Sequence, residues 1–235
     1  MTTNTRDQDR TDSGTAIRAA WLALAVCAAS LSLLALSSLL IILGWSTPLP
    51  RGWLWQEQVV IVFTILGAPV LGGLVAYNRP ANPYGWAWLG FGAGLALSSF
   101  GQNYLIYTTW VRPGSLPAPG PVLVVAGAGW VSAMVILPFL LLLFPDGRLP
   151  SPRWRIVAWV AALAGGVILP LGAFRPDQKL GPIESPFRAQ GAVGEAIVAI
   201  TSVGLNVVFS AVLLCALSLV FRYRRAAGME RQQIK

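Results

Sequence analysis

Histidine is absent from this chain of 235 residues, and charged residues are scarce. Without histidine the chain can form neither a histidine-ligated metal site nor a Ser-His-Asp triad, and it holds no histidine that could be phosphorylated. Only 11% of the residues are Asp, Glu, Lys or Arg, compared with about 25% in soluble domains. Because 55% are hydrophobic, we expect most of the chain to lie in lipid.

Cysteine and lysine are also rare. Cys27 and Cys215 each lie inside a long apolar run, where a thiol typically acts as a small packing residue rather than as half of a disulfide or metal pair. The chain has 2 Lys against 15 Arg, a bias typical of GC-rich bacterial genomes. The motifs GxxxxGK[ST], HExxH, CxxC and GxSxG do not occur. We therefore expect no catalytic site, no cofactor and no metal in this chain.

Long apolar runs follow one another with short polar breaks. A membrane-spanning helix needs about 20 apolar residues, and six runs qualify: 19–45, 59–77, 85–107, 122–144, 154–174 and 196–221. The sequence thus predicts an all-α polytopic protein, with a membrane domain over 17–221 between a polar tail (1–16) and a basic segment (222–235). The first run is too long for a cleavable signal peptide. The run 85–107 is the weakest, because it contains Gln102 and Asn103.

The distribution of positive charge predicts the orientation. The net charge is +8, but the basic residues flank apolar runs, a pattern that orients membrane proteins rather than one that binds nucleic acid. With six spans, 12 of the 17 Lys and Arg residues fall on the side that holds both chain ends. We therefore expect both ends in the cytoplasm, the lipid bilayer as the main partner and no nucleic-acid partner.

Few polar groups lie within the predicted spans. Gln102, Asn103 and Asn206 are interpreted as donors and acceptors for hydrogen bonds between helices; contact with a ligand is the alternative. Gly90 and Gly94 form a GxxxG pair, which favours a close approach by another helix. The spans contain essentially no ionisable residue, which argues against an ion-coupled transporter made from one chain.

The predicted turn between the fourth and fifth spans reads Pro145-Asp146-Gly147-Arg148. Proline fixes φ, aspartate bonds its local backbone and glycine permits positive φ, so this sequence favours a tight turn. We interpret Asp146 and Arg148 as a solvated pair across the turn, worth about 0–1 kcal/mol. The alternative is a turn that takes part in signalling or in docking between the two helices.

Three segments in order carry a resemblance to a known family. They are NPYGW (82–86), LFPDGRLPSPRW (143–154) and RRAAGMERQQIK (224–235). Over residues 58–235 the chain resembles the N-terminal membrane region of multi-span bacterial sensor histidine kinases. In that family a cytoplasmic helix with the phosphoacceptor histidine follows, and then an ATP-binding domain; this sequence contains neither, so no catalytic residue carries over.

The resemblance implies a sensor or anchoring module in the bacterial plasma membrane. It implies a homodimer, a cytoplasmic kinase or output domain as partner, and an output linker that includes Arg222, Arg224, Arg225, Glu230 and Arg231. The chain is then either part of a longer kinase or a membrane homologue without the kinase half. A small transporter or channel subunit and an accessory membrane protein remain alternatives. The predicted outer loops are too short for a folded external domain, so a stimulus would act within or at the membrane.

Overall fold

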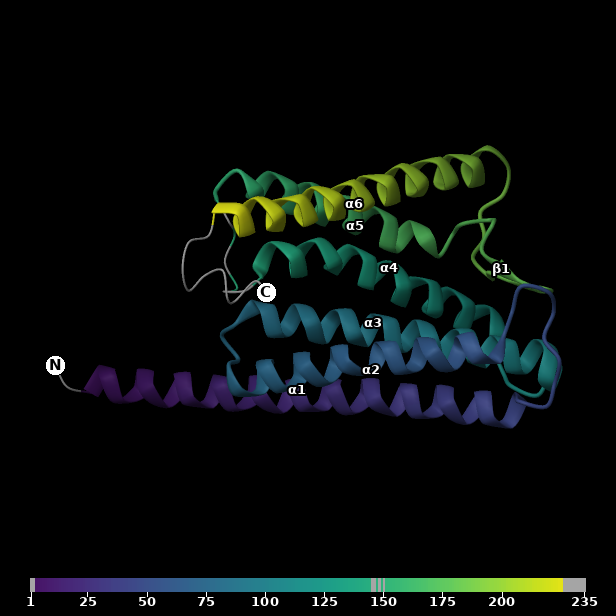
Figure 1. Ribbon diagram of the computed structural model, residues 1–235, viewed down its shortest axis with the longest axis horizontal. Coiled ribbons are helices and arrows are strands. Elements are labelled where there is room, and N and C mark those ends of the chain that lie inside the picture. Colours follow the sequence, from purple (N-terminus) through teal and green to yellow (C-terminus); the bar gives the residue numbers. More distant parts are fainter. Residues whose placement is uncertain (1–2, 145–146, 148, 150, 226–235) are drawn as a thin grey trace.

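The computed structural model describes residues 3–144, 147, 149 and 151–225, and within these ranges the side chains of residues 14–220. Six long helices make up nearly all of it (Figure 1), as the sequence predicts. They are α1 (Thr3–Gly44), α2 (Trp55–Asn78), α3 (Pro83–Ile106), α4 (Pro119–Leu143), α5 (Trp154–Gly172) and α6 (Gly191–Arg225).

Two smaller elements were not predicted. A π-helical turn, η1 (Tyr107–Val111), continues α3 and ends it. The segment between α5 and α6 contains a short antiparallel hairpin of β1 (Lys179–Leu180) and β2 (Ile183–Glu184), in which Lys179 pairs with Glu184. Gly181 lies in the hairpin turn with φ +58°, a value that glycine adopts without strain.

Within the described residues, five helices are long and apolar enough to cross a membrane: α1, α2, α4, α5 and α6. The exception is α3, the run predicted to be weakest. It contacts α1, α2 and α4, so its buried residues face other helices instead of lipid. A helix enclosed in this way can carry more glycine, serine and amide groups, because neighbouring helices supply the packing and the hydrogen bonds.

The observed helices extend beyond several predicted bounds. At its N-terminal end α1 begins at Thr3 instead of residue 19. Its 42 residues correspond to about 63 Å at 1.5 Å per residue, roughly twice the hydrocarbon thickness. The apolar part runs from Gly14 to Gly44, and the polar N-terminal turns project beyond the bundle (Figure 1). Similarly, α2 begins at Trp55, whose indole N–H donates to the carbonyl of Thr47 at 2.9 Å.

Glycines set the closest helix contacts. A Cβ at Gly72 of α2 would lie 2.2 Å from the backbone nitrogen of Leu89 in α3. On another face of α3, a Cβ at Gly94 would lie 2.7 Å from the carbonyl oxygen of Gly129 in α4. Gly94 belongs to the predicted GxxxG pair, and Gly90 faces Ile136 of the same helix α4. The pair therefore lies at the contact between α3 and α4.

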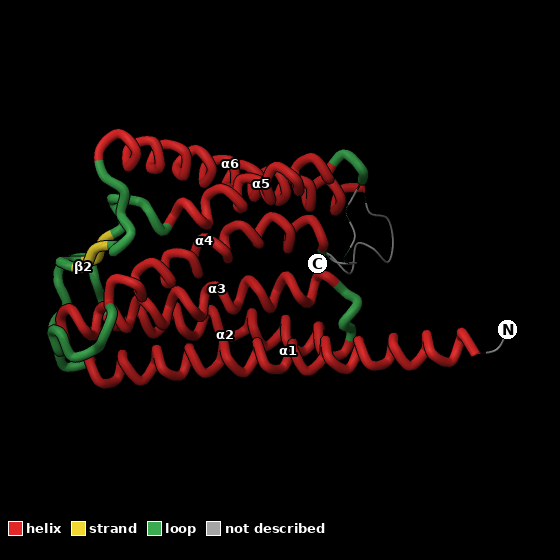
Figure 2. Tube along the Cα trace, turned by 180° about the vertical axis from the view of Figure 1, so that it is seen from behind, coloured by secondary structure: helices red, strands yellow, loops and turns green. Residues whose placement is uncertain are grey.

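The helices form two groups that α4 connects. In both views α1, α2 and α3 lie side by side, while α5 and α6 lie together beyond α4 (Figures 1 and 2). Helix α4 contacts α3 on one side and α5 and α6 on the other. The start of α1, the α2–α3 loop and the C-terminal end of α6 lie at one end of the bundle; the β hairpin lies at the other. The described start and end of the chain therefore lie at the same end of the bundle.

Candidate functional site

Two of the segments that carry the family resemblance meet at the end of the bundle that holds both termini. The first segment begins at Asn82, whose side-chain Oδ1 accepts a hydrogen bond from the backbone N–H of Tyr84 at 3.0 Å and caps α3. Trp86 holds the same loop by donating its indole N–H to the carbonyl of Pro80 at 2.9 Å. These bonds fix the direction in which α3 returns after α2.

The second segment reaches this loop at Gly147. Gly147 has φ +71°, and its N–H donates to the carbonyl of Leu143 at 2.7 Å. A Cβ there would lie 2.6 Å from Asn82 Oδ1, so no larger residue fits without movement. The ring centroids of Tyr84 and Phe144 are 6.2 Å apart. We call these four residues, Asn82, Tyr84, Phe144 and Gly147, the elbow.

Some of the other residues predicted for the turn and for the output linker lie outside the residues that the structure describes, and the rest lie at the described end of α6. Asp146 and Arg148 of the turn lie outside the described residues, as do Glu230 and Arg231 of the linker. Helix α6 continues to Arg225, so Arg222, Arg224 and Arg225 belong to the same helix that crosses the apolar region. One continuous helix therefore runs from the apolar part of α6 to its basic end.

Asn103 connects two helices in the apolar core. Its side chain is 1% exposed, and its Nδ2 donates to Ser37 Oγ of α1 at 3.0 Å and to the carbonyl of Ser99 at 3.0 Å. The hydroxyls of Ser37 and Ser99 lie 3.2 Å apart. This cluster joins α1 to α3 by the kind of interhelical hydrogen bond that the sequence suggested.

Gln58 is a buried polar residue that the sequence analysis missed, because the second span was predicted to begin at residue 59. Leu89 lies opposite Gly72, and Gly92 lies opposite Pro69, and this antiparallel register places Gln58 level with Asn103. Within the described part of the chain, neither Gln58 Oε1 nor Asn103 Oδ1 has a hydrogen-bond partner. The core of α1–α3 therefore holds two acceptors whose burial is costly.

The remaining predicted amides do not connect helices. Gln102 is partly buried, and its side chain has no hydrogen bond within residues 14–144 and 151–220. Asn206 is exposed on α6, and its Nδ2 donates to the carbonyl of Ser202 in the preceding turn at 2.8 Å. Of the three predicted residues, only Asn103 bonds to another helix of the same chain.

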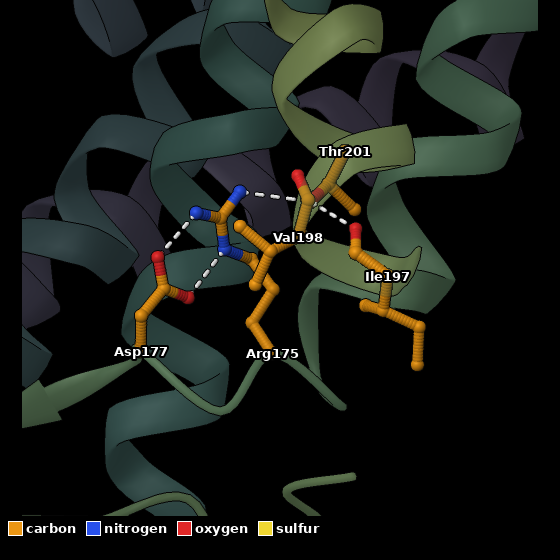
Figure 3. Close-up of polar contacts among 5 residues, drawn as sticks. All are labelled: Arg175, Asp177, Ile197, Val198 and Thr201. Carbon is orange, nitrogen blue, oxygen red and sulfur yellow. Dashed lines mark hydrogen bonds and ion pairs between the residues drawn. The ribbon is translucent and has the colours of Figure 1, made fainter. Parts of the chain in front are cut away.

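An arginine clamp closes the end of the bundle opposite the elbow (Figure 3). Arg175 donates from Nε to Asp177 Oδ1 at 2.8 Å and from a terminal nitrogen to Oδ2 at 2.5 Å. Its other terminal nitrogen donates to Thr201 Oγ1 of α6 at 2.8 Å. The clamp thus ties the segment after α5 to α6. The sequence analysis did not identify this pairing, although the short Arg-Pro-Asp spacing permits it.

The two ionisable groups of the clamp stabilise each other's charge. The hydrogen bonds from the Arg175 guanidinium lower the pKa of the Asp177 carboxyl below its ordinary value. The same bonds raise the pKa of Arg175, although burial acts in the opposite direction. The Arg175 side chain is 22% exposed and that of Asp177 is 51% exposed, so the pair is partly accessible to solvent.

A cavity of about 310 Å³ lies beside the clamp, between α4, α5 and α6. Apolar side chains line most of it, and Arg175, Asp177 and Gln178 lie at its polar end. Gln178 donates from Nε2 to the carbonyl of Leu123 at 3.1 Å. This contact requires Gly127, since a Cβ there would lie 2.2 Å from Gln178 Nε2. The volume is at the lower end of the range for small-molecule pockets, about 300–1,000 Å³.

No family model, curated protein or solved structure matches this chain. Among the described residues, no group of three or more His, Cys, Asp or Glu side chains could hold a metal ion. The described features are the elbow at one end of the bundle, the arginine clamp and its cavity at the other, and polar residues between them.

Proposed function

We propose that this protein is the membrane-embedded input and anchoring module of a two-component signalling histidine kinase, with both chain ends in the bacterial cytoplasm. The observation that carries the proposal is the elbow. Two segments that resemble this kinase family, about 60 residues apart in the sequence, contact each other through Asn82 and Gly147. They do so at the end of the bundle that also holds the C-terminal end of α6.

The packing offers a physical route for a signal. Helices α1–α3 form one group, and α5 and α6 form another, with α4 between them. The elbow holds the turn that leads into α5, and the clamp holds the other end of α5 to α6 through Arg175 and Thr201. A shift of the second group against the first would therefore move α6, whose helix continues without a break to Arg225. Coupling of this kind requires one element with two arrangements.

The stimulus in this proposal acts within the membrane or at its surface. Outside the elbow end, the connections between helices are short: residues 45–54, 112–118 and 173–190. None of these has the length of a folded domain, which typically needs 50 residues or more. The module would therefore respond to lipid state, to an apolar compound or to another membrane protein.

The first test is to read the gene beyond codon 235. The proposal expects the reading frame to continue into a helical segment with a histidine and then into an ATP-binding domain. A stop codon directly after Lys235 would refute the kinase assignment for this protein. Substrate flux through the purified protein in liposomes would instead favour a transporter or channel subunit.

The second test uses the complete gene product in membrane vesicles with ATP. Deletion of residues 222–235 should uncouple phosphorylation of the histidine from the membrane module and leave insertion intact. Deletion of residues 3–13 is the matched control, since it removes a polar segment at the same end of the bundle, on α1. Equal phosphorylation in the two deletion variants would contradict the proposed role of α6.

A further inference from the structure

The cavity between α4, α5 and α6 has apolar walls and one polar end. Its volume is about 310 Å³. The apolar walls include Val124 and Val131 of α4 and Leu169 of α5, and the clamp residues Arg175 and Asp177 form the polar end. A water-sized group occupies about 30 Å³ in a liquid, so the cavity suits a molecule of about ten non-hydrogen atoms. Its lining fits a small amphiphile, which has an apolar body and one polar group.

The arginine clamp leaves hydrogen-bonding capacity unused at this polar end. A guanidinium group has five N–H donors. Within the described residues, Arg175 uses three of them, two toward Asp177 and one toward Thr201 (Figure 3). Each carboxylate oxygen of Asp177 can accept more than one hydrogen bond, and this side chain is about half exposed. A ligand that both donates and accepts, as a hydroxyl group does, can therefore bond to both members of the pair.

The charges around the cavity favour a neutral ligand. The positive charge of Arg175 and the negative charge of Asp177 cancel each other. The whole segment 173–195 is balanced in the same way, with three basic and three acidic side chains: Arg175, Lys179 and Arg188, and Asp177, Glu184 and Glu195. A carboxylate ligand would be attracted by Arg175 but repelled by Asp177, and an ammonium ligand would meet the reverse. Neither sign of charge gains a net advantage that could offset its loss of hydration.

We infer that this cavity binds a neutral single-chain alcohol, of the size of a medium-chain 1-alkanol. Its hydroxyl group accepts a hydrogen bond from Arg175 and donates one to Asp177, and its chain lies between α4, α5 and α6. The ligand contacts all three helices, so its binding favours the arrangement in which the clamp joins α5 to α6. Binding is independent of the proposed kinase function; only the further step, that such an alcohol is the stimulus, rests on it.

Photolabelling of the full chain in phosphatidylcholine vesicles tests the site. The probe is a medium-chain 1-alkanol that carries a diazirine, and mass spectrometry of peptides locates the label. We expect label on residues 124–131, 169–178 and 205, and its loss in the presence of excess 1-decanol. Decane, decanoate and decyltrimethylammonium, compared at equal mole fraction in the lipid, should each compete at least about tenfold more weakly. This is the factor expected for losing a hydrogen bond to a charged group.

Two variants narrow the cavity from different helices. Gly172 lines it at the end of α5, and a Cβ there would meet nothing within 4 Å, so Gly172→Leu places a side chain in open space. Ala128→Leu narrows the cavity from α4. Each should reduce the label that 1-decanol displaces at least about fivefold, the factor for mild overpacking. Gly166→Leu is the matched control, because Gly166 also lies in α5 with open space around it but does not line the cavity.

Three results would overturn the inference. One is label spread along the lipid-facing helices that excess 1-decanol does not displace, which shows partition into the bilayer only. Another is competition by decane or by either charged analogue that equals competition by 1-decanol, because the clamp then selects nothing. The last is equal displaceable label in Gly166→Leu and in both cavity variants. The competition series uses the wild-type chain, so it decides the question even where a variant fails to fold.

Discussion

The contact between α3 and α4 gives the sharpest prediction of stability. In Gly94→Ala the new Cβ would lie 2.7 Å from the carbonyl oxygen of Gly129 and 3.2 Å from the nitrogen of Ala133. The first distance is shorter than real Cβ contacts, and both neighbours are helix backbone, so the helices must separate. Overpacking of this kind costs about 1–3 kcal/mol. Alanine recovers about 0.5–1 kcal/mol of helix propensity, so the middle of the two ranges leaves a net loss of about 1 kcal/mol.

The assay is thermal unfolding of the purified protein in detergent. At about 2–4 °C per kcal/mol for a chain of this size, Gly94→Ala should lower the midpoint by about 2–4 °C. Gly67→Ala is the control, because Gly67 is exposed in α2 and a Cβ there would meet nothing within 4 Å. Gly67→Ala should gain the helix-propensity contribution of alanine, so its unfolding midpoint should be slightly higher than that of the wild type. The reasoning fails if Gly94→Ala is as stable as Gly67→Ala.

Three further predictions concern the polar core, the elbow and the clamp. Ser37→Ala removes one of the two acceptors of Asn103 Nδ2, and should cost about 0.6 kcal/mol and at most about 2, measured by thermal unfolding. Gly147→Ala places a Cβ 2.6 Å from Asn82 Oδ1 at φ +71°, and should lower the midpoint by several degrees, since strain of this kind costs about 1–3 kcal/mol. Asp177→Asn should reduce the fall in the thermal unfolding midpoint that the wild type shows as the pH becomes acidic. The pKa of Asp177 is lowered in the folded state, so its stabilisation is complete above the ordinary carboxyl pKa, about 3.9, and is lost as the pH falls through the lowered value.

Each of these predictions has a matched control in the chain. Ser32→Ala removes a hydroxyl that is exposed and bonds only to the carbonyl of Ala28, so it should be nearly neutral. Gly114→Ala has a similar φ of +73° but open space around it; if Gly147→Ala costs no more, the contact with Asn82 contributes nothing. Glu184→Gln breaks the other ion pair of the loop, with Arg188. If Glu184→Gln reduces the acid-induced fall in the unfolding midpoint as much as Asp177→Asn does, the effect is not caused by the clamp.

Two asparagines show which interhelical hydrogen bonds the sequence predicted correctly and which it did not. Asn103 and Asn206 look alike in the sequence, as single amides in apolar runs, and both were expected to bond between helices. In the structure, Asn103 reaches Ser37 of α1, whereas Asn206 faces outward. The difference depends on which helices are neighbours, and no local pattern records that. The elbow and the clamp were equally hidden, since each joins residues that are distant in the sequence or lie on different elements.

What the sequence by itself determined was the class of the protein: an all-α chain of six helices, rich in apolar residues, with two adjacent amides, Gln102 and Asn103, in the weakest run. Hydropathy over about 20 residues depends only on neighbours in the sequence, so it predicts membrane helices without knowledge of the fold. Only the tertiary structure decided that α3 lies enclosed by α1, α2 and α4, that Gly147 meets Asn82 and that α6 leaves Asn206 exposed. Helix packing depends on contacts between residues far apart in the chain, and apolar helices of similar composition do not specify their neighbours by hydropathy alone.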